Sequence, residues 1–265
     1  MCEIELKTEI NKLMEKWAAY CHRPQSLWAN SIFVKDGPFP QYEGQRTKIL
    51  FIGRELYGKQ NKEDGLCINY WDERAGMDKL GVFQSRLLYL AYGIHKRECG
   101  LDDWLNMKEA KELNKLFANE GKPFDDQFSY AFMNACKILN TKSTYVGKDF
   151  QEFIKDPNNR VFFIREIELI NPDIIISENL NDLSFFTDAN DFYQEFKGKI
   201  EANRESQFHN ENCFVWQYKI NNKKIPWLDA YHFSRRGDTF EHFYEPICKA
   251  AKILLGKDES AEHIE

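Results

Sequence analysis

Short apolar runs that end in polar residues recur along the chain and predict buried strands. The first covers residues 49–52, and we expect it to end at Gly53, where glycine permits a sharp turn. The second covers residues 128–137 and carries Asn134 near its end, and the third covers residues 173–179. Continuous apolar runs are typical of strands buried on both faces, as in the centre of a parallel sheet.

Between these runs, apolar residues recur at the spacing of amphipathic helices. The helices expected on this basis cover residues 3–20, 83–95, 150–170 and 239–255, and an exposed helical insertion rich in Lys and Glu is expected over residues 101–122. The third of these helices should end at Asn171-Pro172, because proline disfavours helical geometry in the residue before it. A strand that follows a helix in this way indicates a parallel sheet.

Two more strands are expected toward the C-terminus. Residues 213–220 alternate between apolar and polar side chains, which indicates an edge strand, with Asn221-Asn222 as its turn. Residues 225–231 then form a last strand that leads into the polar segment 232–237. The whole pattern predicts an α/β protein built around a small, mainly parallel sheet.

Length and composition favour one globular domain over residues 1–265. Residues 1–46 would form the first helix and an irregular lead-in, and residues 257–265 a frayed tail. No apolar run is long enough to cross a bilayer, and the first residues are acidic where a signal peptide would be basic. We therefore expect no membrane association and a cytoplasmic location.

Charge and cysteine usage narrow the classes of function. A formal net charge of −6 argues against broad, sequence-independent attachment to nucleic acid, but leaves room for a small basic cleft that grips a few phosphates. The seven cysteines lie far apart and include no CxxC pair, which indicates reduced structural thiols. We expect no metal and no cofactor.

The segment after the first strand carries the strongest chemical signal. In open α/β sheets ligands bind outside the carboxyl ends of the strands, and Arg54, Glu55 and Tyr57 follow such a strand directly. Arg54 is suited either to hold a phosphate or to pair with Glu55 and keep it ionised. Asn134 is suited to read the edge of a base, or it caps a loop.

Three motifs stand in a fixed order: GRELYG at residues 53–58, REIELINPDIIIS at residues 165–177 and AYHFSRR at residues 230–236. Together they resemble the uracil-DNA glycosylase superfamily, over a stretch from about residue 47 to residue 250. The resemblance implies a three-layer α/β/α fold around a small parallel sheet. It also implies DNA as the partner.

The resemblance assigns roles to individual residues. Glu55 matches the carboxylate that activates water or stabilises charge, and His232 matches the histidine that hydrogen-bonds a base carbonyl. The residues matched to the base-binding groups are Tyr57, Ile68 and Asn134. Those matched to phosphate contacts or to a wedge between bases are Arg54, Phe233, Ser234, Arg235 and Arg236.

The motifs also depart from the family pattern. No proline follows Glu55 or His232, and Ile68 stands where the family has a stacking aromatic residue. His232 also fits an ordinary hydrogen-bonded loop histidine, and Arg235-Arg236 a solvated pair.

Three functions follow from these motifs. The first is a DNA glycosylase-like enzyme that hydrolyses the N-glycosidic bond of uracil or another modified base. The alternative is a non-catalytic module on the same fold that binds a nucleotide or nucleic acid. A third is an α/β enzyme using Arg54 and Glu55 on a phosphorylated metabolite, although no glycine-rich phosphate loop supports it.

Overall fold

The computed structural model describes most of the predicted core. The described residues are 2–58, 67–69, 82–98, 129–141, 147–178, 180, 214–220, 223–230, 233 and 244–255. The predicted insertion at residues 101–122, the turn Asn221-Asn222 and the tail from residue 257 onward lie outside them.

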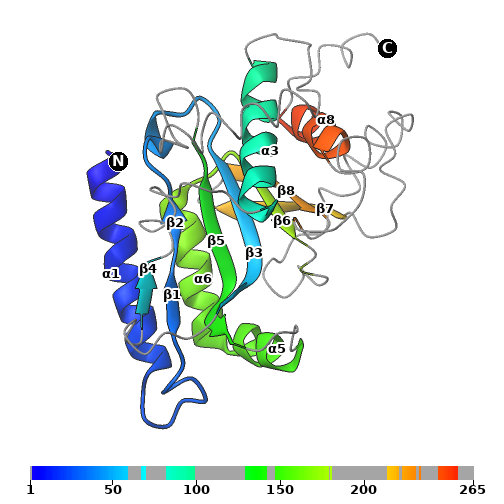
Figure 1. Ribbon diagram of the computed structural model, residues 1–265. Helices are drawn as coiled ribbons and strands as arrows, with labels where there is room; N and C mark the ends of the chain where they lie inside the picture. Colours follow the sequence, from blue (N-terminus) through cyan, green and yellow to red (C-terminus); the bar gives the residue numbers. More distant parts are fainter. Residues whose placement is uncertain are drawn as a thin grey trace.

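The strands form one mixed, mostly parallel sheet (Figure 1). Its strands are β1 (Phe33–Lys35), β2 (Gly37–Pro38), β3 (Ile49–Tyr57), β4 (Cys67–Asn69), β5 (Ala131–Asn140), β6 (Ile174–Glu178), β7 (Phe214–Ile220) and β8 (Lys223–Ala230). Their order across the sheet is β4-β1-β5-β3-β6-β8-β7, with β2 paired to β5 off this path. The predicted α/β class is confirmed, since the central strands β5, β3, β6 and β8 are parallel to one another.

Antiparallel pairs flank the parallel centre of the sheet on both sides. β7 pairs with β8 from Phe214↔Asp229 to Ile220↔Lys223, so the predicted edge strand is confirmed. On the other side, β1 is antiparallel to β5 and parallel to β4, and neither β1 nor β4 was predicted from the sequence. Both have three residues, which is too short for a periodic signal.

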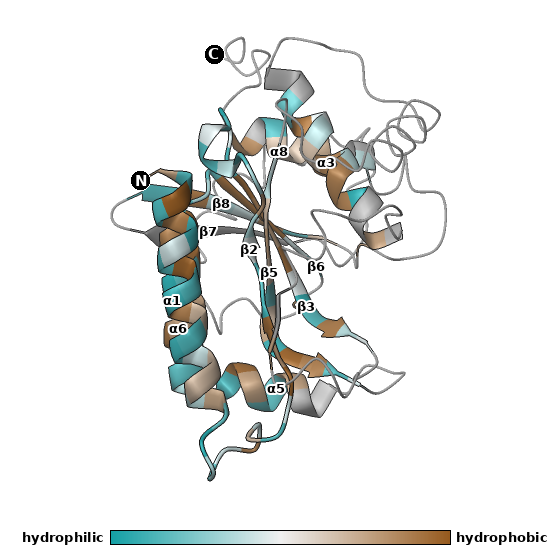
Figure 2. Cartoon of the chain, turned by 60° about the vertical axis from the view of Figure 1, so that its left-hand side comes forward, coloured by the Kyte–Doolittle hydropathy of each residue, from teal (hydrophilic) through white to brown (hydrophobic). Residues whose placement is uncertain are grey.

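Helices cover both faces of this sheet (Figure 1). On one face lie α1 (Glu3–Cys21), α5 (Gly147–Lys155) and α6 (Pro157–Ile170), and on the other α3 (Val82–Glu98) and α8 (Glu245–Leu254). The Trp17 ring of α1 meets Phe33 of β1, while the Phe83 ring of α3 meets Phe132 of β5. In Figure 2, apolar positions gather along the strands and along the helix sides turned toward them.

The helix predicted over residues 150–170 is two helices. Pro157 begins α6 at a position where its missing N–H is no loss, and Asp156 caps the helix by accepting the N–H of Asn158 at 2.8 Å. The predicted end is confirmed, because Asn171 takes the left-handed conformation with φ of 47°. The first helix is confirmed as well, as α1.

The expected turn at Gly53 is wrong. β3 continues through Gly53 to Tyr57, and pairs with β5 over that length. Glycine is needed there for close packing, since a Cβ at this position would lie 3.0 Å from the Phe132 ring and 3.2 Å from both Asn134 Oδ1 and Glu178 Oε1. Asn134 likewise lies within β5, opposite Gly53, and not near the strand end.

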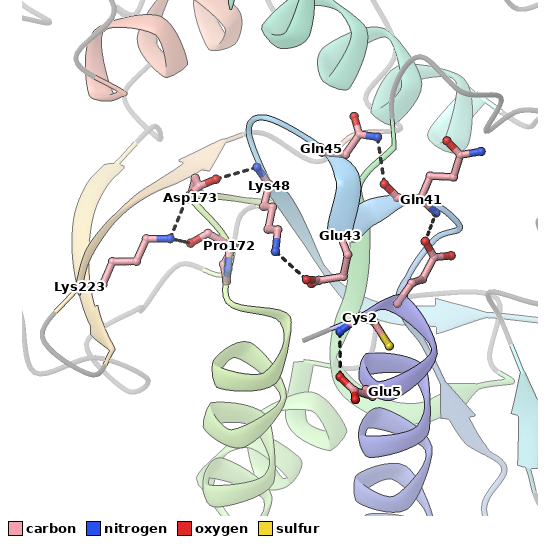
Figure 3. A network of polar contacts seen from close by, with 10 residues as sticks. Cys2, Glu5, Gln41, Glu43, Gln45, Lys48, Pro172, Asp173 and Lys223 are labelled. Carbon is pink, nitrogen blue, oxygen red and sulfur yellow. Dashed lines mark hydrogen bonds and ion pairs between the residues drawn. The ribbon is translucent and has the colours of Figure 1, made fainter.

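A polar network ties the amino ends of the central strands together (Figure 3). The Lys48 N–H, just before β3, donates to Asp173 Oδ2 at 2.9 Å, and the Asp173 N–H donates back to the Lys48 carbonyl at 2.7 Å. Lys223, at the start of β8, donates to Asp173 Oδ1 at 2.6 Å. These contacts fix β3, β6 and β8 at the sheet end opposite their carboxyl ends.

One charged cluster is fully buried between the sheet and α6. Lys137 of β5 forms ion pairs with Asp36 and, at 2.7 Å, with Glu166 of α6, and none of these side chains is exposed. The Lys137 ammonium also lies 5.3 Å from the Trp17 ring centroid. Burial raises the pKa of Glu166 well above its usual value although Lys137 lowers it, so Glu166 tends to keep a proton.

Three structural findings bear on the remaining expectations. None of the helices in the described ranges is long and apolar enough to cross a membrane. Within the same ranges, no three His, Cys, Asp or Glu side chains are grouped to hold a metal ion. The described cysteines are all free thiols, namely Cys2, Cys21, Cys67, Cys136 and Cys248.

Candidate functional site

The order of the strands singles out one position in the sheet. β3 has β5 on one side and β6 on the other. The chain goes from β3 to β4 and β5 on the one side, and from β6 to β7 and β8 on the other. The chain therefore leaves the carboxyl ends of the adjacent strands β3 and β6 in opposite directions. Ligands of open α/β sheets bind at such a switch point, so the residues at the ends of β3 and β6 are the candidate site.

Glu55 lies on β3 just beyond the last β3–β6 pair, Ile52↔Ser177. Its side chain is 9% exposed. Oε1 accepts the Tyr57 hydroxyl at 2.9 Å and the Asn140 amide at 3.4 Å. Oε2 is itself buried and has no hydrogen-bond partner among the described residues, so one oxygen of this carboxyl group is left unsatisfied inside the protein.

The environment of Glu55 favours the protonated form more than water does. Burial raises the pKa of Glu55, while the hydrogen bond from Tyr57, the charge of Arg54 and the Asn140 amide lower it by less. A carboxylate whose pKa is moved toward neutrality is a better general base than a solvated one. Burial and the Glu55 carboxylate also raise the pKa of the Tyr57 phenol, so Tyr57 stays a donor to Glu55.

Tyr57 and Asn140 reach Glu55 because the β3–β5 ladder is irregular at this point. Glu55 pairs with Cys136 and Tyr57 with Asn140, so an advance of two positions along β3 corresponds to an advance of four along β5. The extra residues form a bulge, which re-aims side chains at a strand end. Tyr57 is 43% exposed, so the Glu55 carboxyl lies beneath a partly solvated ring.

Arg54 lies on the other face of the sheet from Glu55, because successive strand residues point to opposite faces. Its guanidinium lies 5.0 Å from the ring centroid of Phe150 in α5. The backbone N–H of Arg54 donates to Glu178 Oε1 at 3.2 Å. The expected phosphate contact of Arg54 stays a prediction.

Glu178 ends β6 and is 3% exposed. Its Oε2 accepts the backbone N–H of Phe233 at 3.1 Å, so the carboxyl group connects β3 with the segment that follows β8. Burial raises its pKa to about 8, although the hydrogen bonds from Phe233 and Arg54 lower it. Beside it, Asp229 accepts the Ser177 hydroxyl at 2.6 Å and the Leu180 N–H at 3.1 Å.

The structure brings only part of the predicted site together. Glu55, Tyr57 and Arg54 lie at the end of β3, and the main chain of Phe233 lies close to them through Glu178. The Phe233 side chain is fully buried against Phe51 and Phe83, which favours a packing role over the expected wedge. The predicted residues that lie outside the described ranges are His232, Ser234, Arg235 and Arg236.

Ile68 lies apart from Glu55, whereas Asn134 lies on the neighbouring strand β5, opposite Gly53. Asn134 is buried, and its side-chain N–H donates to Asp36 Oδ2 at 2.9 Å, so that donor is already bonded within the protein. Ile68 lies in β4, the strand at the far edge, with β1 and β5 between it and β3. Ile68 is therefore not brought to the Glu55 carboxyl, and the predicted base-binding roles of both residues stay predictions.

Sequence reasoning missed two residues of this site, Glu178 and Asn140. Glu178 carries the same signal as Glu55, a carboxylate that follows a buried apolar run. Asn140 carried no such signal, because the strand was expected to end at residue 137 and the bulge that brings Asn140 to Glu55 leaves no mark in the sequence. Comparison with models of known families and with curated proteins gives no match for this chain.

Proposed function

We propose that this protein is a divergent relative of the uracil-DNA glycosylases that hydrolyses the N-glycosidic bond of uracil or another modified base in DNA. The observation that carries the proposal is the Glu55 carboxyl group at the switch point. It is nearly buried, one oxygen is held by Tyr57, and the other has no partner among the described residues. The mixed, mostly parallel α/β sheet is compatible with the three-layer fold of that superfamily.

Glu55 would act on water. Oε2 accepts a proton from a water molecule as the water oxygen bonds to C1′ of the sugar, while the bond from C1′ to the base nitrogen breaks and its electron pair leaves with the base. The carboxylate also offsets the positive charge that develops on the sugar. The proton passes to solvent, and the products are an abasic sugar and the free base.

His232 would stabilise the departing base. The negative charge of that base grows on its carbonyl oxygen, where an imidazole N–H donor has most effect. The neighbouring Phe233 N–H is bonded to Glu178, at the same sheet end as Glu55. This contact supports a histidine donor on the approach to Glu55. A base inside a duplex must first be flipped out, which costs a few kcal/mol.

The test is cleavage of oligonucleotides that carry uracil or one of a panel of modified bases. We expect abasic product from the wild type, and a loss of about 100-fold or more in kcat for Glu55→Gln and for His232→Ala. Glu43→Gln is the matched control, because Glu43 pairs with Lys48 at the opposite sheet end and should leave kcat unchanged. Absence of abasic product over the whole panel, with normal binding, would refute the proposal.

One observation favours the second candidate, a binding module without turnover. The Asn134 amide donor that the resemblance assigns to base reading is bonded to Asp36. A binding module predicts oligonucleotide binding that weakens with salt and no abasic product, because phosphate contacts release counterions. Arg235→Ala/Arg236→Ala should reduce the salt dependence. Binding that is absent or insensitive to salt would exclude this candidate.

A further inference from the structure

Glu178 lies where the β3–β6 and β6–β8 ladders end. It forms the last β6–β8 pair, Glu178↔Ala230, and follows the last β3–β6 pair, Ile52↔Ser177. Beyond these pairs the ladders stop, although β3 continues and the chain from β8 goes on to Phe233. Backbone N–H groups past the end of a ladder need another acceptor when they are buried.

The Glu178 side chain supplies that acceptor to both neighbours. Oε1 accepts the Arg54 N–H at 3.2 Å, and Oε2 accepts the Phe233 N–H at 3.1 Å. One oxygen therefore binds β3, and the other binds the segment that follows β8. The absence of a side chain at Gly53 leaves room for this carboxyl group, because Glu178 Oε1 lies only 3.2 Å from where a Cβ of residue 53 would stand.

The Phe233 peptide is held on its other side as well. Arg86 of α3, itself buried, donates from Nη1 to the Phe233 carbonyl at 2.6 Å. The Phe233 ring packs edge-on against Phe51 of β3 and Phe83 of α3, at centroid distances of 5.9 and 5.7 Å. Main chain and side chain together fix this residue against three elements.

Arg54 is the neighbour of Glu55 in the chain, and Phe233 is the neighbour of His232. We propose that Glu178 is a positioning residue that sets the separation between β3 at Arg54, next to Glu55, and the main chain at Phe233, which follows His232 in the sequence. The catalytic part of this inference rests on the proposed function. The clamp between the two backbone amides, referred to below as the Glu178 clamp, does not.

Ionisation of Glu178 offers a way to observe the clamp. A carboxylate accepts from both amides, whereas a protonated carboxyl group has one hydroxyl that competes as a donor. Among the described residues, the charged groups that act on it are Arg54 and Glu55 of β3, while Arg86 of α3 binds the carbonyl of the same Phe233 whose N–H Glu178 accepts. Because burial raises its pKa to about 8, the change falls in an accessible range.

The first experiment follows the Arg54 and Phe233 amide resonances of the full chain by NMR between pH 6 and pH 10, a window around the Glu178 pKa of about 8. We expect both amides to shift with one common midpoint. Glu178→Gln should abolish the shared titration, and Glu166→Gln, a substitution of another fully buried glutamate, should leave it in place. If the two amides of the wild type do not titrate together, the Glu178 clamp is refuted. This outcome does not depend on whether Glu178→Gln folds.

The second experiment measures turnover on the cleaved oligonucleotide. Glu178→Gln should lower kcat about tenfold or more with little change in KM, and should remove a limb of the wild-type pH profile near pH 8. A kcat and pH profile like those of the wild type would overturn the positioning role. If the wild type itself gives no turnover, the proposed function fails, and the amide titration still decides the clamp.

Discussion

At the scale of single residues, the candidate site depends on how the oxygens of two glutamates are used. Glu55 has one oxygen bonded to Tyr57 and one without a partner among the described residues, which suits a group that meets a substrate. Glu178 has both oxygens bonded to backbone amides, which suits a group that holds the chain in place. Burial raises the pKa of both, so burial alone does not separate a reactive carboxyl group from a structural one.

Gly53 is a residue whose replacement should disturb both the fold and the site. In Gly53→Ala the new Cβ would lie 3.0 Å from the Phe132 ring and 3.2 Å from Glu178 Oε1, so these side chains must move. We expect a loss of about 1–3 kcal/mol in the free energy of unfolding, measured by urea denaturation.

Gly44→Ala is the control for this substitution, because a Cβ at Gly44 would meet no atom within 4 Å. It should change the free energy of unfolding by less than about 0.5 kcal/mol. Equal stabilities for the two variants would show that the close approach at Gly53 is not tight in solution.

At the scale of elements, the buried ion cluster joins β5 to the helices α1 and α6 on one face of the sheet. Lys137 of β5 reaches Glu166 of α6 and lies over Trp17 of α1, while Asp36 also accepts two N–H groups of Asn134. One cation thus connects three elements. Replacing it by an apolar side chain removes the ion-pair partner of the buried Asp36 carboxyl group.

Lys137→Met should therefore lower the free energy of unfolding by about 3–5 kcal/mol. Lys12→Met, which removes an exposed pair with Glu9, should change it by less than about 1 kcal/mol. Both are measured by urea denaturation at pH 7. If Lys137→Met is as stable as Lys12→Met, the buried cluster does not depend on its cation.

Long periodic elements could be predicted from the sequence, and close contacts between elements could not. The apolar stripe of α1 and the Asn171-Pro172 stop follow from local chemistry, so both were predicted correctly. Pro157 is a helix-start signal, but the apolar spacing continues across it, so one helix was expected where the structure has α5 and α6. The sequence alone does not distinguish a glycine needed for close packing from a glycine needed for a turn, and for this reason a turn was expected at Gly53.

The same limit applies to the candidate site. Glu55 could be found because it follows an apolar run, and the structure puts it at the switch point. The bond from Asn134 to Asp36 joins residues 98 positions apart and depends on a short strand that no pattern announced. The opposite facing of Arg54 and Glu55 followed only once β3 was known to continue.

At the scale of the whole molecule, the buried carboxyl groups should make stability depend on pH. Burial raises the folded-state pKa of Glu55, Glu166 and Glu178 above the ordinary value of 4.5, so the folded chain holds more protons than the unfolded chain above that pH. Their contribution is fully present below about pH 4.5 and is lost as the pH rises toward the folded pKa values.

We therefore expect the free energy of unfolding to fall between pH 5 and pH 8, by up to about 1.4 kcal/mol per pH unit for each such group. Urea denaturation over this range measures the slope. Glu178→Gln should have a shallower slope than the wild type, because the neutral amide does not titrate. A wild-type stability that rises over the same range would contradict the raised pKa values.

The contacts of Asp173 with Lys48 and Lys223 have a consequence for how this scaffold can change. They lock the register of the sheet from the end remote from the candidate chemistry. Exchange of the loops at the opposite end would therefore change the substrate while the core packing stays the same. Such loop exchange is the usual way in which one α/β framework acquires new specificities in evolution.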